Sequence, residues 1–406
     1  MKPLKGNRYF FKHEQMDFEV LCALGGCYYG NADAGEVLST AARVRDGDFE
    51  SWFREWNATA ERVRAAAAAS AAEGNRVSAR RAFLRAGSYF SLAAAMVDGT
   101  DDPSRLVPAW SAHRDCWREF CSRLEPPAEE VEIPYEGTRL PGHFFRPDPS
   151  PEPRAVIVFN NGSDGSLCGM WASGVAAALE RGYAALTFDG PGQNSLLWLQ
   201  GIPFRPDWEN VITPVVDYVC GRPDVDGNRI ALSGISQGGY WILRALAFEH
   251  RPAAGIADPG VMDVSTAMLA KLPGFMRKHL ETGEEGKFNR EMAWTARLLG
   301  KSVRQSLAFR MKPYATDNYY EWIRAARRFN LRGVIQHIRC PVFIADPENE
   351  QFWPGQPRRV FEALECPKTI VRFTAAEGAD RHCQPLARGL YDQRMFDWLA
   401  GVMPAR

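Results

Sequence analysis

The sequence predicts an α/β fold in which a mostly parallel sheet carries helices on both faces, with a helical domain ahead of it. Two observations predict this fold. From about residue 155 onward, short apolar runs alternate with helical stretches, which is typical of right-handed strand–helix–strand crossovers. Before about residue 125, apolar residues recur at helical spacing instead. We therefore expect a helical N-terminal domain over residues 1–127 and an α/β domain over residues 128–406.

Length, charge and cysteine content agree with this division and exclude several classes of partner. The 406 residues exceed one small domain, and 46% of them are hydrophobic, which is ample for two cores. The 49 basic residues balance 49 acidic ones, so nucleic acid and acidic membranes are not expected partners. No apolar run approaches the ~20 residues of a membrane span, and no signal-peptide pattern is present. Nine cysteines without a Cys-x-x-Cys pair favour free thiols and a cytoplasmic location.

Three stretches of the N-terminal domain carry apolar residues on one helical face. The first follows Asp48, a residue type that caps helix N-termini. Such stripes are typical of packing seams between helices rather than of ligand sites. Their members are Phe49, Trp52, Phe53, Trp56, Ala60 and Val63 in the first; Ala82, Phe83, Ala86, Tyr89, Phe90, Ala93 and Val97 in the second; and Leu106, Trp110, His113, Trp117, Phe120 and Leu124 in the third.

After Glu125-Pro126-Pro127 the apolar spacing changes from that of helices to that of strands. Two short runs around Glu136-Gly137 predict an antiparallel hairpin, Val131–Tyr135 with Leu140–Arg146. One later interval, about residues 262–335, is helical and too long for a crossover, so it predicts an insertion. The other predicted strands are Ala155–Asn160, Tyr183–Asp189, Arg229–Ile235, Ala254–Asp258, Val342–Asp346 and Lys368–Thr374.

The segment Gly234-Ile235-Ser236-Gln237-Gly238 is the clearest candidate for chemistry. It lies between an apolar run that predicts a strand and a run from Tyr240 that predicts a helix. A G-x-S-x-G turn in this position is typical of a serine nucleophile held on a sharp, strained bend. The N-terminus of the following helix directs free N–H groups at the same place, which favours developing negative charge. We therefore predict Ser236 as a nucleophile.

A serine nucleophile needs a base and a carboxylate that orients the base. Of the seven histidines only His382 follows the final predicted strand, and we predict it as the base. Three carboxylates follow the strand that ends near residue 345, and Glu350 is favoured as the acid because it precedes a proline-containing turn. Asp346 at the strand tip is the alternative acid, and Glu348 is a third candidate.

The negatively charged oxygen formed during such a reaction needs two N–H donors. One predicted donor is the main-chain amide of Gln237, and the other is that of Ser163, with Asp164 as the second choice. Ser163 lies in Asn160-Asn161-Gly162-Ser163-Asp164-Gly165, directly after a predicted strand. No metal-binding spacing or complete dinucleotide-binding loop is found, so no metal and no cofactor are expected.

Several segments together resemble one branch of the α/β-hydrolases, the branch of the 2,6-dihydroxy-pseudo-oxynicotine hydrolases and the fungal-pigment hydrolases that shorten polyketides. The resemblance covers nearly the whole chain, although the loop at Asn160 begins Asn-Asn-Gly where Gly-Gly is expected. The matching segments are Gly47-Asp48-Phe49-Glu50-Ser51-Trp52 with Trp56, Phe188-Asp189-Gly190-Pro191-Gly192-Gln193, Gly234–Tyr240, Asp346–Glu350, Pro354-Gly355-Gln356, and Glu377-Gly378-Ala379 with His382-Cys383.

This resemblance implies an α/β-hydrolase fold whose insertion at about 262–335 forms a cap, with the N-terminal helices as a lid. It implies a serine hydrolase that cleaves a carbon–carbon bond beside a ketone, in an aromatic or polyketide-like β-dicarbonyl compound. The branch also contains esterase-like and cyclase-like members, so a carboxylesterase, a lactonase or a polyketide cyclase remains an alternative. A prolyl-type peptidase is disfavoured because residues 1–125 are helical, and a receptor without catalysis is disfavoured by the intact serine and histidine.

The expected partner is a small molecule, and a homodimer is compatible with the sequence. Aromatic residues in both helical regions could line a pocket for a flat, conjugated substrate, although core packing is the expected fate of most. They are Tyr28, Tyr29, Trp52 and Trp56 in the N-terminal domain and Trp294, Tyr319, Tyr320 and Trp322 in the insertion.

Overall fold

A computed structural model describes residues 8–405, apart from the side chain of Ser302. The chain divides into two compact units. The helical unit contains the residues up to Glu129, together with Ser166–Ala177 and Pro385–Gly389. The α/β unit contains Glu130–Gly165, Ala178–Gln384 and the residues from Leu390 onward. Sequence patterns did not indicate that two short later segments join the helical unit.

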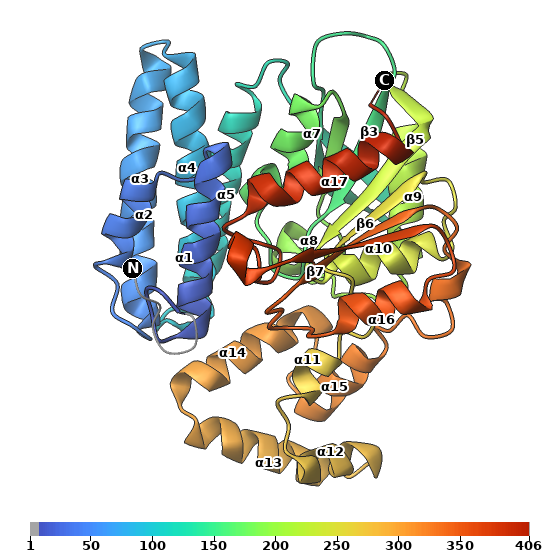
Figure 1. Ribbon diagram of the computed structural model, residues 1–406. Coiled ribbons are helices and arrows are strands. Elements are labelled where there is room, and N and C mark those ends of the chain that lie inside the picture. Colours follow the sequence, from blue (N-terminus) through green and yellow to red (C-terminus); the bar gives the residue numbers. More distant parts are fainter. Residues whose placement is uncertain (1–7, 406) are drawn as a thin grey trace. The chain divides into compact units, whose positions relative to one another are not determined.

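The helical unit is built from long antiparallel helices around an aromatic core. Asp48 caps one helix, since its carboxylate accepts a hydrogen bond from the Ser51 N–H at 2.9 Å, as predicted. Trp52 and Trp56 are fully buried, and the Trp52 indole donates to the Leu92 carbonyl at 2.6 Å. The helices (Figure 1) are α1 (Glu14–Gly26), α2 (Ala34–Ala41), α3 (Phe49–Ala72), α4 (Arg76–Ala94), α5 (Leu106–Cys121) and α6 (Leu167–Met170).

The two later segments are bound into this unit by specific contacts. The Asn31 side-chain amide donates to the Cys168 carbonyl at 2.6 Å. The Trp171 indole donates to the Tyr29 carbonyl at 3.2 Å, and its ring meets the Phe120 ring edge to face at 4.8 Å. Because these contacts satisfy polar groups and bury rings, the helical unit requires both the N-terminal helices and the later segments.

The α/β unit contains one eight-stranded sheet with the order β1-β2-β4-β3-β5-β6-β7-β8. Strands β3 to β8 run parallel, and β2 pairs antiparallel with β4. The predicted hairpin is present, and both residues of its turn, Glu136 and Gly137, have positive φ. The strands are β1 (Glu129–Tyr135), β2 (Thr138–Phe145), β3 (Arg154–Asn160), β4 (Ala184–Phe188), β5 (Val225–Ile235), β6 (Ala254–Asp258), β7 (Val342–Pro347) and β8 (Lys368–Phe373).

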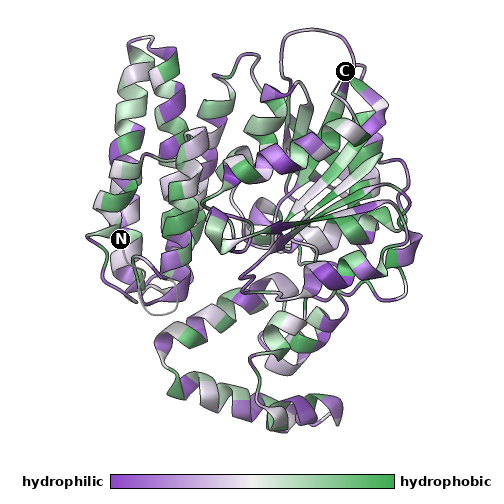
Figure 2. Cartoon of the chain, viewed as in Figure 1, coloured by the Kyte–Doolittle hydropathy of each residue, from purple (hydrophilic) through white to green (hydrophobic). Residues whose placement is uncertain are grey.

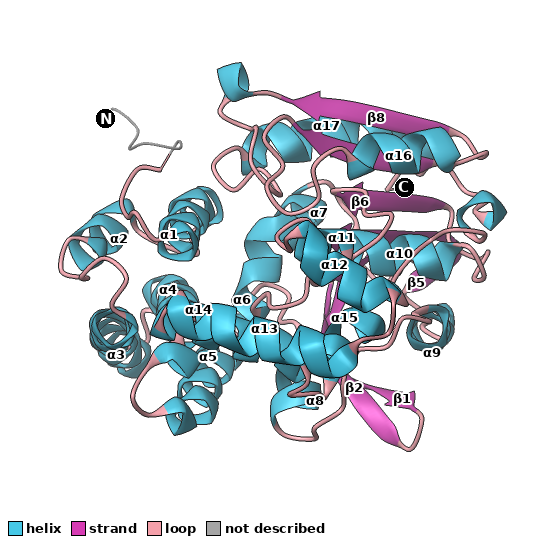
Figure 3. Cartoon of the chain, turned by 90° about the horizontal axis from the view of Figure 1, so that it is seen from below, coloured by secondary structure: helices cyan, strands magenta, loops and turns pink. Residues whose placement is uncertain are grey.

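Helices cover both faces of this sheet, which confirms the predicted fold class (Figure 3). Strands β3, β4 and β6 are buried along their whole length, because a parallel sheet between helices has no face toward water. These strands are largely green, and so hydrophobic, in Figure 2. The helices beside the sheet are α7 (Ala176–Glu180), α8 (Asn194–Trp198), α9 (Glu209–Cys220), α10 (Gly238–Leu246), α16 (Gln356–Ala363) and α17 (Arg388–Val402).

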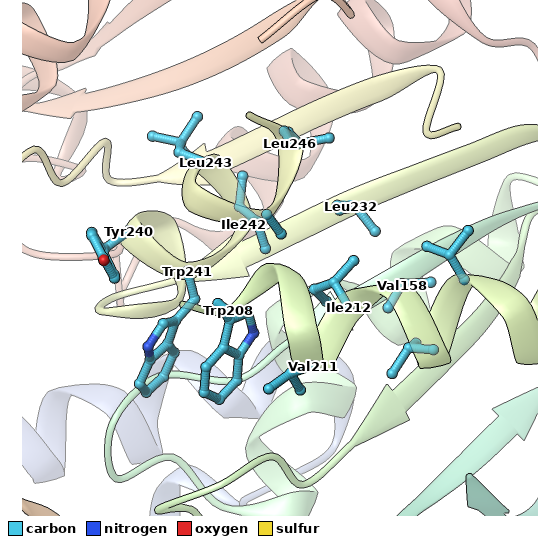
Figure 4. Packing of buried hydrophobic residues seen from close by; sticks show 14 of the residues in the cluster. Val158, Trp208, Val211, Ile212, Leu232, Tyr240, Trp241, Ile242, Leu243 and Leu246 are labelled. Carbon is cyan, nitrogen blue, oxygen red and sulfur yellow. The ribbon is translucent and has the colours of Figure 1, made fainter. Parts of the chain in front are cut away.

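One face of the sheet has a large apolar core against α9 and α10. Within it, the indole rings of Trp208 and Trp241 stack with centroids 4.3 Å apart (Figure 4 shows both rings among aliphatic side chains). Such close packing fixes the helix that follows β5, and with it the turn between them. On the other face, α17 packs aromatic residues against the sheet, including Tyr391 against Phe343 at 6.3 Å.

The predicted insertion lies between β6 and β7 and is helical, as expected (yellow to orange in Figure 1). Its two ends lie side by side, because Asp263 and Asn330 form an antiparallel bridge. The insertion has a hydrophobic cluster of its own, which includes Met276, Phe288 and Trp322. Its helices are α11 (Thr266–Leu269), α12 (Gly274–Glu281), α13 (Glu285–Leu298), α14 (Lys301–Met311) and α15 (Tyr319–Arg327).

Over residues 8–405, no helix combines the length and the apolar character that crossing a bilayer requires.

Candidate active site

Ser236 lies in a tight turn between β5 and α10, at the carboxyl edge of the sheet. Its φ angle is +57°, in the left-handed region that non-glycine residues seldom adopt. Its main-chain N–H donates to the Asp258 carbonyl at 2.6 Å, which holds the turn against β6. A β-carbon at Gly234 would lie 2.2 Å from the Gly238 carbonyl oxygen, so the bend requires glycine there.

Three predicted residues form a continuous chain of hydrogen bonds. The Ser236 Oγ lies 2.9 Å from Nε2 of His382. The other ring nitrogen, Nδ1, lies 2.8 and 3.0 Å from the two carboxylate oxygens of Glu350. Since an ionised carboxylate only accepts hydrogen bonds, Nδ1 carries the proton and Nε2 can accept one from the serine. The residues come from the ends of β5, β7 and β8, which meet at one edge of the sheet.

Glu350 is almost fully buried and yet remains ionised. Its Oε1 accepts hydrogen bonds from the N–H groups of Phe352 at 2.9 Å and Trp353 at 3.2 Å. Burial by itself raises the pKa of this carboxyl, but its interactions with His382 and these hydrogen bonds outweigh that effect, so its pKa lies below the ordinary value. The buried carboxylate therefore provides negative charge beside the imidazole.

The loops that carry Glu350 and His382 are joined to one another. The Asn349 N–H donates to the Asp380 carbonyl at 2.8 Å, and its side-chain amide donates to the Asp380 carboxylate at 2.6 Å. The His382 N–H donates to the Gln351 side chain at 3.2 Å. The aromatic ring of Phe352 contacts the imidazole edge to face at 4.7 Å. These contacts restrict the rotation of the imidazole and hold it between the serine and the carboxylate.

The two other carboxylates of this loop have different partners. Asp346 is buried at the end of β7 and accepts hydrogen bonds from Arg372 at 2.7 Å and Arg358 at 3.2 Å. Glu348 accepts one from the Ala375 N–H at 2.8 Å. Asp346 therefore braces β7 against β8 and α16, and among the three acids considered from the sequence Glu350 is the one that bonds to His382.

The loop after β3 lies directly against the serine. A β-carbon at Gly162 would lie 2.9 Å from the Ser236 Cβ, so glycine permits this approach. The Gly162 N–H donates to the Asn161 side-chain oxygen at 2.8 Å, and it is thereby occupied. Among the described residues, no acceptor is found for the main-chain N–H of Ser163 or of Gln237. These are the two amides predicted as donors to a negatively charged oxygen.

Gln193 holds this loop in place, a role that the sequence motif did not indicate. Its side-chain amide nitrogen donates to the carbonyls of Asn161 at 3.0 Å and Gly162 at 2.7 Å. Its side-chain oxygen accepts from the Gly190 N–H at 2.8 Å. Both halves of one buried amide are thus satisfied, and they fix the Gly162–Ser163 segment beside Ser236.

Asn194 and Asp189 extend this support. The Asn194 amide donates to the Asp189 carboxylate at 2.8 Å and to the Gly165 carbonyl at 3.3 Å. Burial raises the pKa of Asp189 to about 6, although the hydrogen bonds from Asn194 and Ser195 act against it. Asp189 and Asn194 therefore anchor the far end of the loop that carries Ser163.

A cavity of about 330 Å³ within the α/β unit adjoins this site. Ser163 and Gln237 form part of its wall, and so do Phe352 and Trp353, whose rings contact His382. Its volume is that of a site for a small organic molecule. The insertion supplies most of the apolar wall, including Met268, Leu272, Met276, Met292, Leu307 and Trp322.

The aromatic residues singled out from the sequence mostly pack elsewhere. Trp322 lines the cavity, whereas Tyr319 and Tyr320 pack beside the apolar cluster of the insertion. The Trp294 side chain is 65% exposed. In the helical unit, Trp52 and Trp56 belong to the core, and Tyr28 is mainly exposed. Other rings line the cavity in their place, namely Trp198, Phe204, Phe309, Tyr314, Phe352 and Trp353.

Three features define this protein as an α/β-hydrolase. It has a mostly parallel sheet, a serine on a strand–turn–helix bend at the carboxyl edge of that sheet, and a helical insertion before β7. Solved structures share this fold. A 2,6-dihydroxy-pseudo-oxynicotine hydrolase superimposes with a TM-score of 0.72 over 93% of this chain and 95% of its own, at 20% identity. The protein described as AbyA5 superimposes with a TM-score of 0.67 over 97% of this chain and 96% of its own, at 15% identity.

Curated relatives match almost end to end. Hydrolase LUC6 of Fusarium sp is 31% identical over 94% of this chain and 95% of its own. Hydrolase acrC of Aspergillus aculeatus is 31% identical over 96% and 97%, and the 20-hydroxy-prefusarin hydrolase FUS2 of Gibberella moniliformis is 29% identical over 96% of both chains. Residues 175–300 match the model of the prolyl oligopeptidase family. This chain belongs to the family of α/β-hydrolases that includes these relatives, and it is a hydrolytic enzyme.

Proposed function

We propose that this enzyme is a serine hydrolase that cleaves a carbon–carbon bond beside a ketone in an aromatic or polyketide-like β-dicarbonyl compound. Ser236 is the nucleophile, His382 the base and Glu350 the acid that orients it. The observation that carries the proposal is the chain of hydrogen bonds from Ser236 through His382 to Glu350 beside an apolar cavity.

In the first half of the reaction Ser236 adds to one carbonyl carbon of the substrate. The serine proton passes to Nε2 of His382 as the oxygen–carbon bond forms, and Glu350 stabilises the imidazolium. The main-chain N–H groups of Gln237 and Ser163 bind the negatively charged oxygen. When this intermediate collapses, its carbonyl re-forms and the carbon–carbon bond breaks. The bonding electrons leave as an enolate, which takes its proton from the imidazolium.

In the second half, water releases the acyl group from Ser236. His382 accepts a proton from the water as its oxygen bonds to the acyl carbon. The same two N–H groups bind the second negatively charged oxygen. Collapse then returns the proton from His382 to Ser236 and liberates a carboxylic acid, in which one oxygen comes from water.

The cavity and the relatives support this substrate class. Apolar side chains and rings form most of the cavity wall, which suits a conjugated molecule with few polar groups. One of the relatives is named a 20-hydroxy-prefusarin hydrolase, and a structure with the same fold is named a 2,6-dihydroxy-pseudo-oxynicotine hydrolase. Ester or lactone hydrolysis uses the same residues with an easier leaving group and is the competing reaction.

The two reactions are separated by assaying an aryl β-diketone and a short acetyl ester side by side in labelled water. We expect the diketone to give an acid that contains one labelled oxygen and a shortened ketone. Acetyl esters should react poorly because they lack the distant contacts that orient the carbonyl. The Ser236→Ala protein should be folded and inactive. Faster turnover of short esters than of every diketone tried would replace this proposal with an esterase.

The acid is tested by comparing two conservative variants of the same loop. Glu350→Gln should lower kcat by about 10²–10⁴, since the imidazole loses its orienting charge. Asp346→Asn should affect mainly stability, because its partners are Arg358 and Arg372. If Asp346→Asn lowers kcat more than Glu350→Gln in folded protein, the acid is Asp346. Labelling by a serine-directed phosphonate reports in parallel whether Ser236 is activated.

A further inference from the structure

Helix α13 of the insertion ends in three large apolar side chains that are mostly exposed. The exposed fractions of Trp294, Leu298 and Leu299 are 65%, 64% and 63%. Trp294 and Leu298 are four positions apart, so they lie side by side on one face of the helix. Single exposed apolar residues are ordinary on protein surfaces, but adjoining ones are typical of interaction sites. Neither Trp294 nor Leu298 lines the cavity or takes part in the mechanism above.

Two arginines lie on the same face and flank the tryptophan. Arg290 is four positions before Trp294 and Arg297 is three positions after it. Both arginines are exposed, and within residues 8–405 neither side chain has an ion-pair or hydrogen-bond partner. These three residues and Leu298 form the outer face of α13, on the side of the insertion away from the sheet (Figure 1).

The opposite face of α13 provides the packing that the helix needs. Phe288, Met292 and Ala296 are buried there, and the last two also line the cavity. An ordinary amphipathic helix has its apolar residues on this inner face and polar residues on the other. The packing of the insertion therefore does not account for Trp294 and Leu298 on the outer face.

Positive charge is concentrated in the insertion. Residues 262–335 contain 14 basic and 7 acidic residues, although the whole chain contains 49 of each. The balance of the whole chain, from which acidic membranes were not expected as partners, is thus an average over an uneven distribution. A surface that combines exposed arginines with exposed apolar side chains suits a partner that is both anionic and apolar.

We propose that the outer face of α13 binds the surface of a membrane that contains anionic lipids. Trp294 and Leu298 would enter the boundary between headgroups and acyl chains, where tryptophan is enriched in membrane proteins. Arg290 and Arg297 would bind lipid phosphates, with their aliphatic stems along the apolar side chains. A second copy of the chain fits this face less well, because a two-fold contact pairs a surface with itself and would bring the arginines together.

The proposed surface adjoins the cavity at Leu299. This residue directly follows Leu298, and it is 63% exposed although it also lines the cavity. The apolar wall of the cavity therefore reaches the exterior beside the outer face of α13. An apolar substrate dissolved in the bilayer would enter the site from there. This last consequence rests on the proposed function, whereas the binding of the membrane does not.

The test is flotation of the full chain with vesicles of phosphatidylcholine alone and of an equal mixture of phosphatidylcholine and phosphatidylserine. We expect binding to the mixed vesicles only, and weaker binding as salt is added. The doubly substituted protein, Arg290→Gln with Arg297→Gln, should bind at least about tenfold more weakly, since each basic residue near an anionic surface contributes about fivefold.

The apolar part of the face is tested at Trp294, with matched controls elsewhere. Trp294→Ala should also weaken vesicle binding at least tenfold. Trp294→Phe should still bind but lose the fluorescence quenching that brominated lipids cause in the wild type. The controls are Arg324→Gln, an exposed arginine of the insertion that is paired with Glu321, and Phe248→Ala, an aromatic residue that is 45% exposed. Both should bind like the wild type.

Four outcomes would overturn the proposal. They are no binding of the wild type to mixed vesicles, equal binding to both kinds of vesicle, unchanged binding of the Trp294→Ala protein, and loss of self-association in that protein, which would assign the face to a second copy. Binding to polyglutamate in place of vesicles would instead indicate an acidic protein as the partner. No substrate is used in these measurements, so the proposed carbon–carbon cleavage is tested independently.

Discussion

The helical unit and the insertion are both built from helices rich in apolar residues, but they are connected to the chain in opposite ways. The helical unit combines three separate stretches, which end at Glu129, Ala177 and Gly389. The insertion is one continuous stretch whose ends meet at the Asp263–Asn330 bridge. Because the helical unit combines distant segments, we expect it to fold only when all of them are present. A continuous insertion whose two ends are adjacent can change in sequence or length without disturbing the sheet.

Their interiors differ as well. In the helical unit the apolar stripes meet one another, and Trp52 and Trp56 stack toward Tyr89 with no exposed surface. In the insertion the cluster around Met276 and Met292 also forms a wall of the cavity. The same helical spacing thus produces a closed core in one region and a binding surface in the other.

Removal of the N-terminal helices should have the largest effect. A chain that begins near Glu129 keeps the segments 166–177 and 385–389 but loses their partners, including Asn31 for the Cys168 carbonyl and Phe120 for the Trp171 ring. The exposed apolar surface should cause aggregation. Size-exclusion chromatography of the expressed fragment measures this. A monodisperse fragment with wild-type kcat/KM would contradict the expectation that the helical unit needs all three of its stretches.

Deletion of the insertion should leave a folded but changed enzyme. Replacement of residues 267–327 by a short Gly-Ser linker is feasible because the Asp263–Asn330 bridge brings the ends together. The apolar cluster of the insertion is removed as a unit. We expect the sheet to fold and Ser236 to react with a phosphonate, while kcat/KM for an aryl diketone falls by at least about 10², since most of the cavity wall is lost.

Circular dichroism and phosphonate labelling of the deleted protein measure this result. An aggregated or unreactive product would show that the insertion is as necessary for folding as the N-terminal helices. That outcome would remove the contrast between the two regions.

Acid should weaken the helical unit by a smaller amount. His113 is fully buried in α5, and burial lowers its pKa to about 4, against the opposing hydrogen bond to the Gly87 carbonyl. Between an unfolded-state pKa near 6.5 and this value, the unfolded chain binds the extra proton. The stabilising contribution is therefore complete above about pH 6.5 and is lost as the pH falls. The loss amounts to about 3 kcal/mol at most.

Urea unfolding at several pH values between 7 and 4 tests this prediction. The His113→Gln protein, which cannot take up that proton, should lose less stability on acidification than the wild type. His279→Gln is a matched control in the insertion, where this ring lies beside Glu284 and Glu291. If the stability of the His113→Gln protein has the same pH dependence as that of the wild type, burial does not lower the pKa of His113.

Much of the fold was predictable because parallel strands buried on both faces are continuous apolar runs. The strands β3 to β8 begin and end within a few residues of the predicted limits. The positions of Ser236, Glu350 and His382 followed from the ends of three such strands, and they lie within hydrogen-bonding distance of one another. Their catalytic roles remain predictions.

Other features could not be predicted, because they depend on contacts between distant residues. Nothing local distinguishes Gln193, which fastens the Gly162 loop with its amide, from a solvated turn residue. The segment 166–177 has the composition of an ordinary crossover, and its membership of the helical unit depends on partners more than 100 residues away. The choice of cavity-lining rings depends similarly on how the insertion packs.

The positive φ angle of Ser236 has a consequence for how this protein can be improved. A left-handed backbone at a residue with a β-carbon costs about 1–2 kcal/mol relative to the right-handed region, and glycine avoids most of this cost. Serine is therefore not the residue that stabilises position 236 best, and the proposed role as nucleophile accounts for its presence there. Random screens for thermostability alone should favour replacement of Ser236 by glycine, so such screens need activity as a second criterion.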